Sequence, residues 1–295
     1  MGLILYKEKI ADYINHNKKT EELGFDKSRL SYIPEYFSSY VKQERIPNFV
    51  CLVSRFGEVA HYSHQGFKNT ESKDEINNET IFRIYSMTKP LTSVAIMMLY
   101  ERGLIRLEHE LYRYLPEFKN TEVWESGDID NFKTKPLAKP ILISDLLTHT
   151  AGFTYDFMLG HPAIGLYRKN GLHDYKNIET QEEMDLEEFC NKLSTLPLLF
   201  EPGEKWHYSC SIDILGRVVE VVSGMKLDAF FRENILNPLE MFDTGFYVEK
   251  DKLDRFSDCY QTMLGSKKKN MTLSHVAGND EFSKSRNFLS GGGGL

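Results

Sequence analysis

The chain has 295 residues, a net charge of -7 at pH 7 and a pI near 5.8, and 41% of its residues are apolar. This size and composition allow a sizeable core, so we expect a folded chain over residues 1–295, as one large domain or two intimate ones, rather than a disordered chain. A single domain is the leading expectation. The negative net charge does not indicate a positively charged surface for nucleic acid, and we expect no nucleic-acid partner. The apolar N-terminal stretch is too short for a signal peptide or a membrane span. It favours a cytoplasmic protein with no membrane span, although a processed precursor would have the same features.

The first predicted elements are a helix and a β-hairpin, within residues 27–66. Apolar residues at helical spacing predict an amphipathic helix in residues 27–45, with Pro34 near its first turn. The segment NFVCLVSRFGEVAHYS has two β-rich runs around a turn that contains Gly57, which is typical of an antiparallel hairpin. A sheet therefore begins early in the chain.

A predicted surface loop separates this hairpin from an apolar helix. The loop is the polar, Asn-rich stretch KNTESKDEINNET, which leads into the short apolar run IFRIY. Apolar residues dominate from Thr88 to Arg102, and Gly103 fits a helix C-cap, so we expect a deeply buried helix there.

The later part of the chain is predicted to be mainly helical. After a stretch rich in charge, proline and aromatic residues, ISDLLTHTAGF predicts a short capped helix that ends in a glycine turn. Helical insertions follow in residues 155–200, and a turn at Pro202 and Gly203 returns the chain. Two more helices are predicted, with Gly224 between them. A helical region over residues 86–240 beside a sheet indicates an α+β architecture.

The cysteines and histidines indicate neither a metal site nor a redox motif. The four cysteines lie far apart without a Cys-x-x-Cys pair, so we expect reduced thiols. His61 and His64 are three residues apart in a predicted strand, where alternation places their rings on opposite faces. We therefore expect no metal or other cofactor.

The pattern Ser-x-x-Lys is a candidate catalytic motif, but it is weak by itself. It occurs four times, at Ser39 with Lys42, Ser86 with Lys89, Ser223 with Lys226, and Ser266 with Lys269. Among these, the Ser86 pattern is the one that begins a predicted buried helix.

A serine in that position is suited to nucleophilic attack. Free backbone N–H groups and the helix dipole stabilise an oxyanion there, and Lys89 lies one turn along the same face. The neutral amine of Lys89 can accept the proton of Ser86, and Tyr208 can relay it if the fold brings it close. The alternative is that Ser86 is an ordinary N-cap and that Lys89 extends into solvent.

Four segments in a particular order resemble the serine β-lactamase-like family, which includes class C β-lactamases, D-alanyl-D-alanine peptidases and family VIII carboxylesterases. They are IFRIYSMTKPLTSVAIMMLYERG, ISDLLTHTAGF, LPLLFEPGEKWHYSCSIDILGRVVEVVSG and LSGGGGL, within a resemblance from about Pro47 to Leu295. The resemblance implies a β-lactamase/transpeptidase-like α+β fold, with an antiparallel sheet flanked by helices and a helical region. It also implies that Ser86 is the acylated nucleophile, Lys89 the general base and Tyr208 the second proton-transfer group.

The resemblance also implies that part of the family's catalytic domain is missing. In relatives, the oxyanion hole uses the backbone N–H of the nucleophile and one from a strand with a Lys-Thr-Gly or His-Gly-Gly-like motif. That motif is absent here, so we expect the chain to be truncated and to lack the C-terminal strands. The segment SGGGGL by itself could be a flexible linker, but the order of motifs favours a glycine-rich turn near the active site.

Cys210 is a second departure from the family pattern. Penicillin-handling relatives have Asn in a Tyr-x-Asn triplet, and a thiol cannot replace the donor and acceptor of that amide. This favours the esterase-like branch and a serine hydrolase that cleaves small esters through a Ser86 acyl-enzyme. β-Lactamase or D-Ala-D-Ala peptidase activity on an amide substrate, and a non-catalytic binding or scaffold protein, are the alternatives.

The candidate substrate contacts are Cys210, Phe153 and Tyr155. Aromatic residues in the helical insertion can line an acyl pocket, although core packing is the simpler interpretation for most of them. The expected partner is a small-molecule substrate, and the oligomeric state stays open.

Overall fold

The computed structural model describes residues 20–172, 175–176, 180, 182–262, 271–275 and 280–295. The described chain forms two compact units, and each is considered by itself. The first unit comprises the described residues up to Arg83 and those between Asn237 and Lys284, and the second comprises Ile84–Leu236 and Ser285–Leu295. The single domain expected from the sequence stays a prediction.

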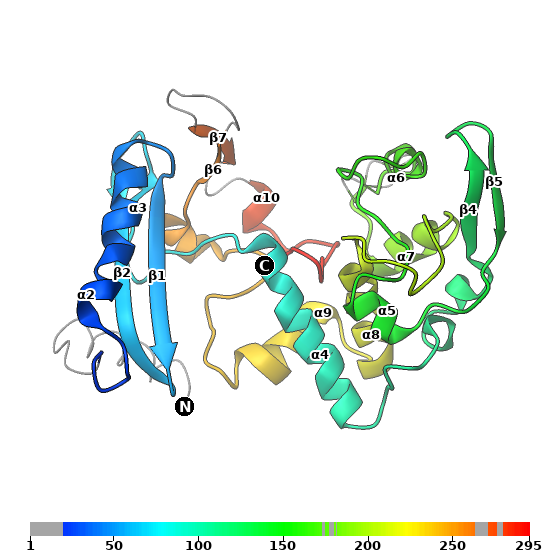
Figure 1. Cartoon of the computed structure of the whole chain (residues 1–295), viewed down its shortest axis with the longest axis horizontal. Helices are drawn as coiled ribbons and strands as arrows, with labels where there is room; N and C mark the ends of the chain where they lie inside the picture. Colours follow the sequence, from blue (N-terminus) through cyan, green and yellow to red (C-terminus); the bar gives the residue numbers. More distant parts are fainter. Residues whose placement is uncertain (1–19, 173–174, 177–179, 181, 263–270, 276–279) are drawn as a thin grey trace. The chain divides into compact units, whose positions relative to one another are not determined.

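The first unit is built on a small antiparallel sheet of order β1-β2-β3, with β6 and β7 paired separately (Figure 1). Its elements are α2 (Lys27–Leu30), α3 (Tyr32–Lys42), β1 (Asn48–Arg55), β2 (Glu58–Asn69), β3 (Asp74–Glu75), the 3₁₀ helix η5 (Lys250–Arg255), β6 (Cys259–Thr262), β7 (Met271–His275) and α10 (Asp280–Ser283). The early sheet expected from the sequence is therefore confirmed.

The predicted N-terminal helix is present as two helices, α2 and α3, with Ser31 between them. Pro34 lies in the first turn of α3, as predicted. The helix α3 packs on the sheet, where the ring of Phe37 stacks on that of Phe49 with 5.2 Å between centroids. The apolar stripe of this helix thus covers one face of the β-hairpin.

The predicted hairpin is confirmed, and its turn has a clear local cause. Arg55 pairs with Glu58, so the loop consists of Phe56 and Gly57, whose φ angles are +54° and +76°. Two positive φ angles are typical of the type I′ turn, which matches the twist of the strands. The conformational freedom of glycine is required at Gly57.

The stretch predicted to be a loop after this hairpin contains the short strand β3. Phe67 pairs with Glu75 across an antiparallel turn. The side chain of Asn69 accepts hydrogen bonds from the backbone N–H groups of Glu71 and Ser72 at 2.9 and 2.8 Å. These bonds close a tight turn, and the turn brings a polar segment back onto the sheet edge.

The second unit is mainly helical. Its elements are the 3₁₀ helix η1 (Tyr85–Thr88), α4 (Lys89–Glu101), the 3₁₀ helices η2 (Leu111–Arg113) and η3 (Pro116–Asn120), β4 (Glu122–Gly127), β5 (Phe132–Pro136), α5 (Ile143–Leu147), α6 (Ile164–Lys169), α7 (Leu186–Ser194), α8 (Ser211–Ser223), α9 (Leu227–Phe231) and the π-helical turn η4 (Arg232–Leu236). The helices α4, α5 and α9 all pack on α8 (Figure 1). The predicted helices around ISDLLTHTAGF and on both sides of Gly224 are confirmed.

The expectation that the helix after Thr88 is deeply buried is wrong for one of its faces. Ala95, Ile96 and Leu99 of α4 are at most 1% exposed. On the other face Val94 and Tyr100 are 49% and 44% exposed. The apolar composition predicted a helix, but it could not identify which side the neighbouring helices cover.

The second unit also contains a β-hairpin that the sequence did not predict. Strands β4 and β5 pair antiparallel, and the rings of Trp124 and Phe132 stack at 5.0 Å. The backbone N–H of Trp124 also donates to Leu198 O at 2.8 Å, so a distant segment extends this small sheet. Among the described residues, no helix combines the length and the apolar character that a membrane span requires.

Candidate active site

Ser86 lies in the 3₁₀ turn η1, directly before α4, with its side chain exposed. Tyr85 has a φ of +45°, which is unusual for a bulky residue. The hydroxyl of Thr88 donates to Tyr85 O at 2.6 Å, and the N–H of Tyr85 donates to Leu295 O at 3.2 Å. The residue before Ser86 is therefore held in a strained conformation from both sides, as is common at functional sites.

Ser86 contacts both predicted proton-transfer groups. Its Oγ lies 2.6 Å from the Tyr208 hydroxyl and 3.2 Å from Lys89 Nζ. Lys89 is half-buried, and its Nζ lies 4.7 Å from the centre of the Tyr208 ring. A hydroxyl between an amine and a phenol is an arrangement in which a nucleophile can lose and regain a proton.

The alternative interpretation of this pair is wrong. The N-cap of α4 is Thr88, and the Ser86 hydroxyl contacts Lys89 and Tyr208 instead of capping the helix. Lys89 does not extend into solvent, because its Nζ donates a hydrogen bond to Gly292 O at 2.6 Å.

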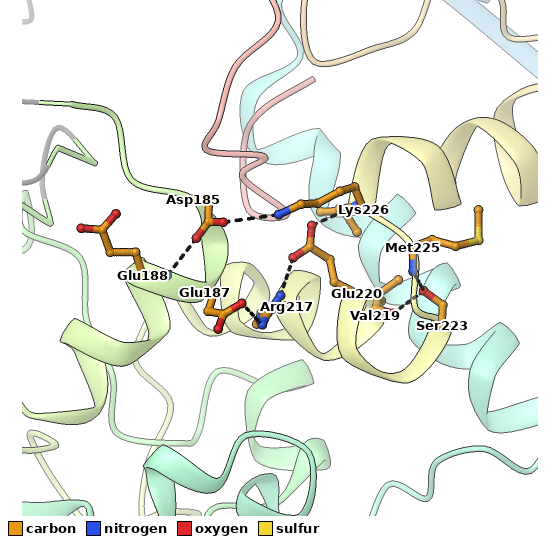
Figure 2. Close-up of polar contacts among 10 residues, drawn as sticks. Asp185, Glu187, Glu188, Arg217, Val219, Glu220, Ser223, Met225 and Lys226 are labelled. Carbon is orange, nitrogen blue, oxygen red and sulfur yellow. Dashed lines mark hydrogen bonds and ion pairs between the residues drawn. The ribbon is translucent and has the colours of Figure 1, made fainter.

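Two other Ser-x-x-Lys patterns lie in described parts of the chain, and both serines bond to their own helices. Ser39 donates to Tyr36 O at 2.6 Å. Ser223 donates to Val219 O at 2.6 Å, while Lys226 lies 3.3 Å from an Asp185 oxygen (Figure 2). The fourth pattern, at residues 266–269, lies outside the described residues.

The glycine-rich segment near Leu295 lies against the start of α4, as predicted, and the linker interpretation is wrong. Gly291 O accepts a hydrogen bond from the Thr92 hydroxyl at 2.7 Å, and Gly292 O accepts the bond from Lys89. The backbone N–H of Leu295 donates to the Thr88 hydroxyl at 3.1 Å. These contacts hold the segment beside Ser86.

Tyr208 precedes α8 and is surrounded by other aromatic rings. The rings of His149, Tyr155 and Trp206 lie 5.0, 5.3 and 6.4 Å from the Tyr208 ring, between centroids. Nδ1 of His149 lies 3.2 Å from the Ser209 hydroxyl. Burial, with a smaller contribution from the charge of Lys89, lowers the pKa of His149 to about 4, so its imidazole is neutral at pH 7.

This neutral histidine gives a pH-dependent prediction. Below its usual pKa of 6.5 the unfolded chain binds a proton that folded His149 rejects, so stability present above pH 6.5 is lost as the pH falls towards 4. Because the ring is partly exposed, we expect a loss on the order of 1 kcal/mol. Urea unfolding at pH 7 and pH 4.5 measures it. The difference in stability between the two pH values should be smaller in His149→Asn, because an amide does not titrate. Asn is a suitable replacement, since it tolerates the φ of +57° at this position. An unchanged pH dependence would contradict the assignment.

The three predicted substrate contacts lie in different surroundings. Cys210 and Phe153 are 2% and 1% exposed. Burial raises the pKa of the Cys210 thiol, which is therefore neutral. Phe153 packs edge-to-face on Phe118 at 5.8 Å between centroids, so its burial supports the core-packing interpretation. Tyr155 lies beside Tyr208 and stacks on Phe157, which is 61% exposed. The role of all three as substrate contacts stays a prediction.

Two residues of this site were not singled out in the sequence. His149 lies inside the segment ISDLLTHTAGF, but a single histidine is no specific signal. Asp213 is a lone acid among apolar neighbours in CSIDILG, and this break in the pattern was the available signal. Within the described ranges, no group of three or more His, Cys, Asp or Glu side chains is arranged to hold a metal ion.

Comparisons with known proteins support the family resemblance that the sequence segments indicated. A family model described as Beta-lactamase matches residues 33–294. Esterase EstB of Burkholderia gladioli is 33% identical over 210 residues, which cover 71% of this chain and 50% of EstB. The chain thus spans about half the length of EstB and of a second curated relative that it matches.

Two solved structures have a similar fold. EstCE1, described as a hydrolase with promiscuous acyltransferase activity, has a TM-score of 0.69 at 28% identity, and the match covers 87% of this chain and 66% of that chain. Unliganded simvastatin synthase LovD of Aspergillus terreus has a TM-score of 0.72 at 25% identity, with 90% and 64% covered. The family model extends over nearly the whole sequence, and both solved structures have a fold similar to that of this chain. This chain therefore belongs to the β-lactamase family and has the β-lactamase/transpeptidase-like α+β fold.

Proposed function

We propose that the protein is a serine hydrolase that cleaves small carboxylic esters through an acyl-enzyme on Ser86. The observation that carries the proposal is the contact of one hydroxyl with two proton-transfer groups, Lys89 and Tyr208. The similarity to esterase EstB supports an ester as the substrate class. The buried thiol at Cys210 supports the same choice, since it cannot provide the amide contacts of the Tyr-x-Asn triplet.

In the proposed acylation step, Ser86 Oγ attacks the ester carbonyl and transfers its proton to the neutral amine of Lys89. The carbonyl oxygen becomes an oxyanion, which the backbone N–H of Ser86 helps to stabilise. When the C–O bond to the alcohol breaks, Tyr208 or Lys89 returns a proton to the leaving oxygen. The products of this step are the free alcohol and an acyl group on Ser86.

In the deacylation step, a water molecule attacks the acyl carbonyl and gives one proton to Lys89 or Tyr208. Ser86 recovers its proton as the acid leaves. If a second alcohol replaces water, the same site transfers the acyl group instead. The description of EstCE1 as a hydrolase with acyltransferase activity supports testing both acceptors.

A fluorophosphonate probe tests this proposal in the full-length protein. We expect one adduct, located on the peptide that contains Ser86, and turnover of a short-chain nitrophenyl ester in preference to a chromogenic cephalosporin or a D-Ala-D-Ala peptide. Cephalosporin turnover as fast as ester turnover would favour the β-lactamase alternative. Absence of an adduct would favour a non-catalytic binding protein.

The Tyr208 hydroxyl can be tested by Tyr208→Phe, which keeps the ring and its contacts with His149 and Tyr155. We expect kcat for a nitrophenyl ester to fall by about 10²-fold, because the proton relay at Ser86 Oγ is lost. Tyr100→Phe, an exposed position on α4, is the matched control and should retain wild-type kcat. Wild-type kcat in Tyr208→Phe would exclude a role for this hydroxyl in proton transfer.

A further inference from the structure

Asp213 is a completely buried carboxylate in the first turn of α8 that the proposed mechanism does not use. Its Oδ1 accepts hydrogen bonds from the Ser290 hydroxyl at 2.5 Å and from the Gly292 N–H at 3.0 Å. Its Oδ2 accepts a longer bond from the Tyr155 hydroxyl at 3.4 Å. One side chain of α8 therefore holds the glycine-rich segment and Tyr155 together.

Two of the three partners of Asp213 also contact Lys89. Gly292 donates its N–H to Asp213 and accepts the hydrogen bond from Lys89 Nζ through its carbonyl oxygen. The centre of the Tyr155 ring lies 5.5 Å from the same Nζ atom. Asp213 is therefore bonded to two of the groups that contact the Lys89 amine.

The close approach of the backbone explains why glycine occupies positions 291 and 292. A Cβ atom at Gly292 would lie 2.6 Å from Asp213 Oδ2 and 2.8 Å from the Tyr155 hydroxyl. At Gly291 it would lie 2.8 Å from Ile212 O, whereas at Gly293 the nearest atom, of Tyr85, is 3.7 Å away. The segment can therefore approach α8 this closely only if positions 291 and 292 carry no side chain, whereas position 293 has room for one.

A buried carboxylate with these partners is costly for stability. Burial raises the pKa of Asp213, although the hydrogen bonds from Ser290 and Gly292 oppose this change. Glu220 of the same helix is also buried, but it pairs with Arg217 at 3.2 Å and accepts a hydrogen bond from the backbone N–H of Leu227 at 3.1 Å (Figure 2). Glu220 joins α8 to α9, while Asp213 bonds to groups that contact Lys89.

We propose that Asp213 is a positioning residue of the acyl-transfer site: it fixes Gly292 and Tyr155 so that the Lys89 amine stays within reach of Ser86 Oγ. The inference rests on the proposed function of Ser86 and Lys89, and it adds a residue that acts on the reaction through Lys89. The three hydrogen bonds, rather than the negative charge, perform this role.

Two substitutions of Asp213 in the full-length protein separate hydrogen bonding from charge. Asp213→Ala removes all three bonds, and we expect kcat and the rate of fluorophosphonate labelling to fall by about 10- to 100-fold, with KM within about threefold of wild type. Asp213→Asn can keep the bonds, because its Oδ1 can accept from Ser290 and Gly292 while its amide nitrogen donates to Tyr155. We expect this variant to retain kcat within about threefold.

The pH dependence of the free energy of unfolding is a second, independent test of the Asp213 carboxyl. For a carboxyl whose folded pKa is raised, stability is fully present below the usual value of 3.8 and is lost as the pH rises through the raised pKa. An amide at position 213 does not titrate. The stability difference between Asp213→Asn and wild type should therefore shift in favour of the amide as the pH rises above 3.8. Urea unfolding of both proteins across this range measures the shift.

Matched controls come from the same helix and the same segment. Glu220→Ala should lower stability and leave kcat unchanged. Gly292→Ala should lower kcat as Asp213→Ala does, whereas Gly293→Ala should not. The double variant Asp213→Ala with Gly292→Ala should lose little more kcat than the worse single variant, because both changes act through one residue.

The outcomes separate this inference from the proposed function. If the wild-type protein is active and Asp213→Ala keeps the same kcat, the role of Asp213 is wrong and the proposed function stands. Equal loss of kcat in Asp213→Asn and Asp213→Ala would also overturn it, since the charge would then be what matters. A wild-type protein without a fluorophosphonate adduct would overturn the proposed function and this role together.

Discussion

Ser86→Ala in the full-length protein is expected to lower kcat for a nitrophenyl ester by about 10⁴-fold or more and to abolish fluorophosphonate labelling. The substitution removes the atom that bonds to the acyl group, so no acyl-enzyme can form. The remaining turnover would come from binding and from the groups that surround the carbonyl. Stopped-flow measurement of the alcohol released in the first turnover should show a burst in wild type and none in the variant.

Ser223→Ala is the matched control for this change. Ser223 also belongs to a Ser-x-x-Lys pattern, but its hydroxyl donates to Val219 O at the end of α8 (Figure 2). We expect wild-type kcat and full labelling in this variant. If Ser86→Ala still turned over ester with a burst, a different nucleophile would be required and the proposed mechanism would be wrong.

Lys89→Met is expected to lower kcat by about 10³-fold, within the range of general-base substitutions. Met keeps an unbranched side chain beside the Tyr155 and Tyr208 rings, but it has no amine to accept the Ser86 proton or to bond Gly292. Lys89→Arg separates proton transfer from charge, because a guanidinium keeps the positive charge and does not deprotonate at ordinary pH. Both variants should therefore lose kcat to a similar extent, as measured by ester turnover and by the labelling rate of Ser86.

The control for Lys89 is Lys226→Met. Lys226 ends the Ser-x-x-Lys pattern at Ser223 and pairs with Asp185, the N-cap residue of α7. We expect this variant to retain ester turnover and to lose at most about 1 kcal/mol of stability, as is typical of an exposed ion pair. Wild-type kcat in Lys89→Arg would show that the positive charge suffices and that Lys89 is not the base.

Elements with strong local signals were predictable from the sequence. The hairpin turn at Phe56 and Gly57 and the end of α8 at Gly224, where φ is +72°, depend on residues adjacent in the chain. The unpredicted hairpin β4–β5 has no such signal, and its third neighbour is Leu198, far along the chain. The exposed face of α4 also could not be predicted, because the covering of a helix depends on where other elements pack.

The site was predictable in part for the same reason. Ser86 and Lys89 are three residues apart, so helical geometry alone places them on one face. Tyr208 was proposed through the order of the family's segments, and the structure places its hydroxyl at Ser86 Oγ. His149 and Asp213 were missed, because their relation to Lys89 and Tyr208 arises from packing between α5, α8 and the glycine-rich segment.

The sequence by itself thus determined the family, the residue types at the site and the contact between near neighbours such as Ser86 and Lys89. The tertiary structure decided that Tyr208, 122 residues from Ser86 in the chain, contacts its hydroxyl, and that Asp213 reaches Lys89 through Gly292. The physical reason is that backbone geometry sets distances within a helical turn, whereas the distance between residues far apart in the chain is set only when the whole core is packed.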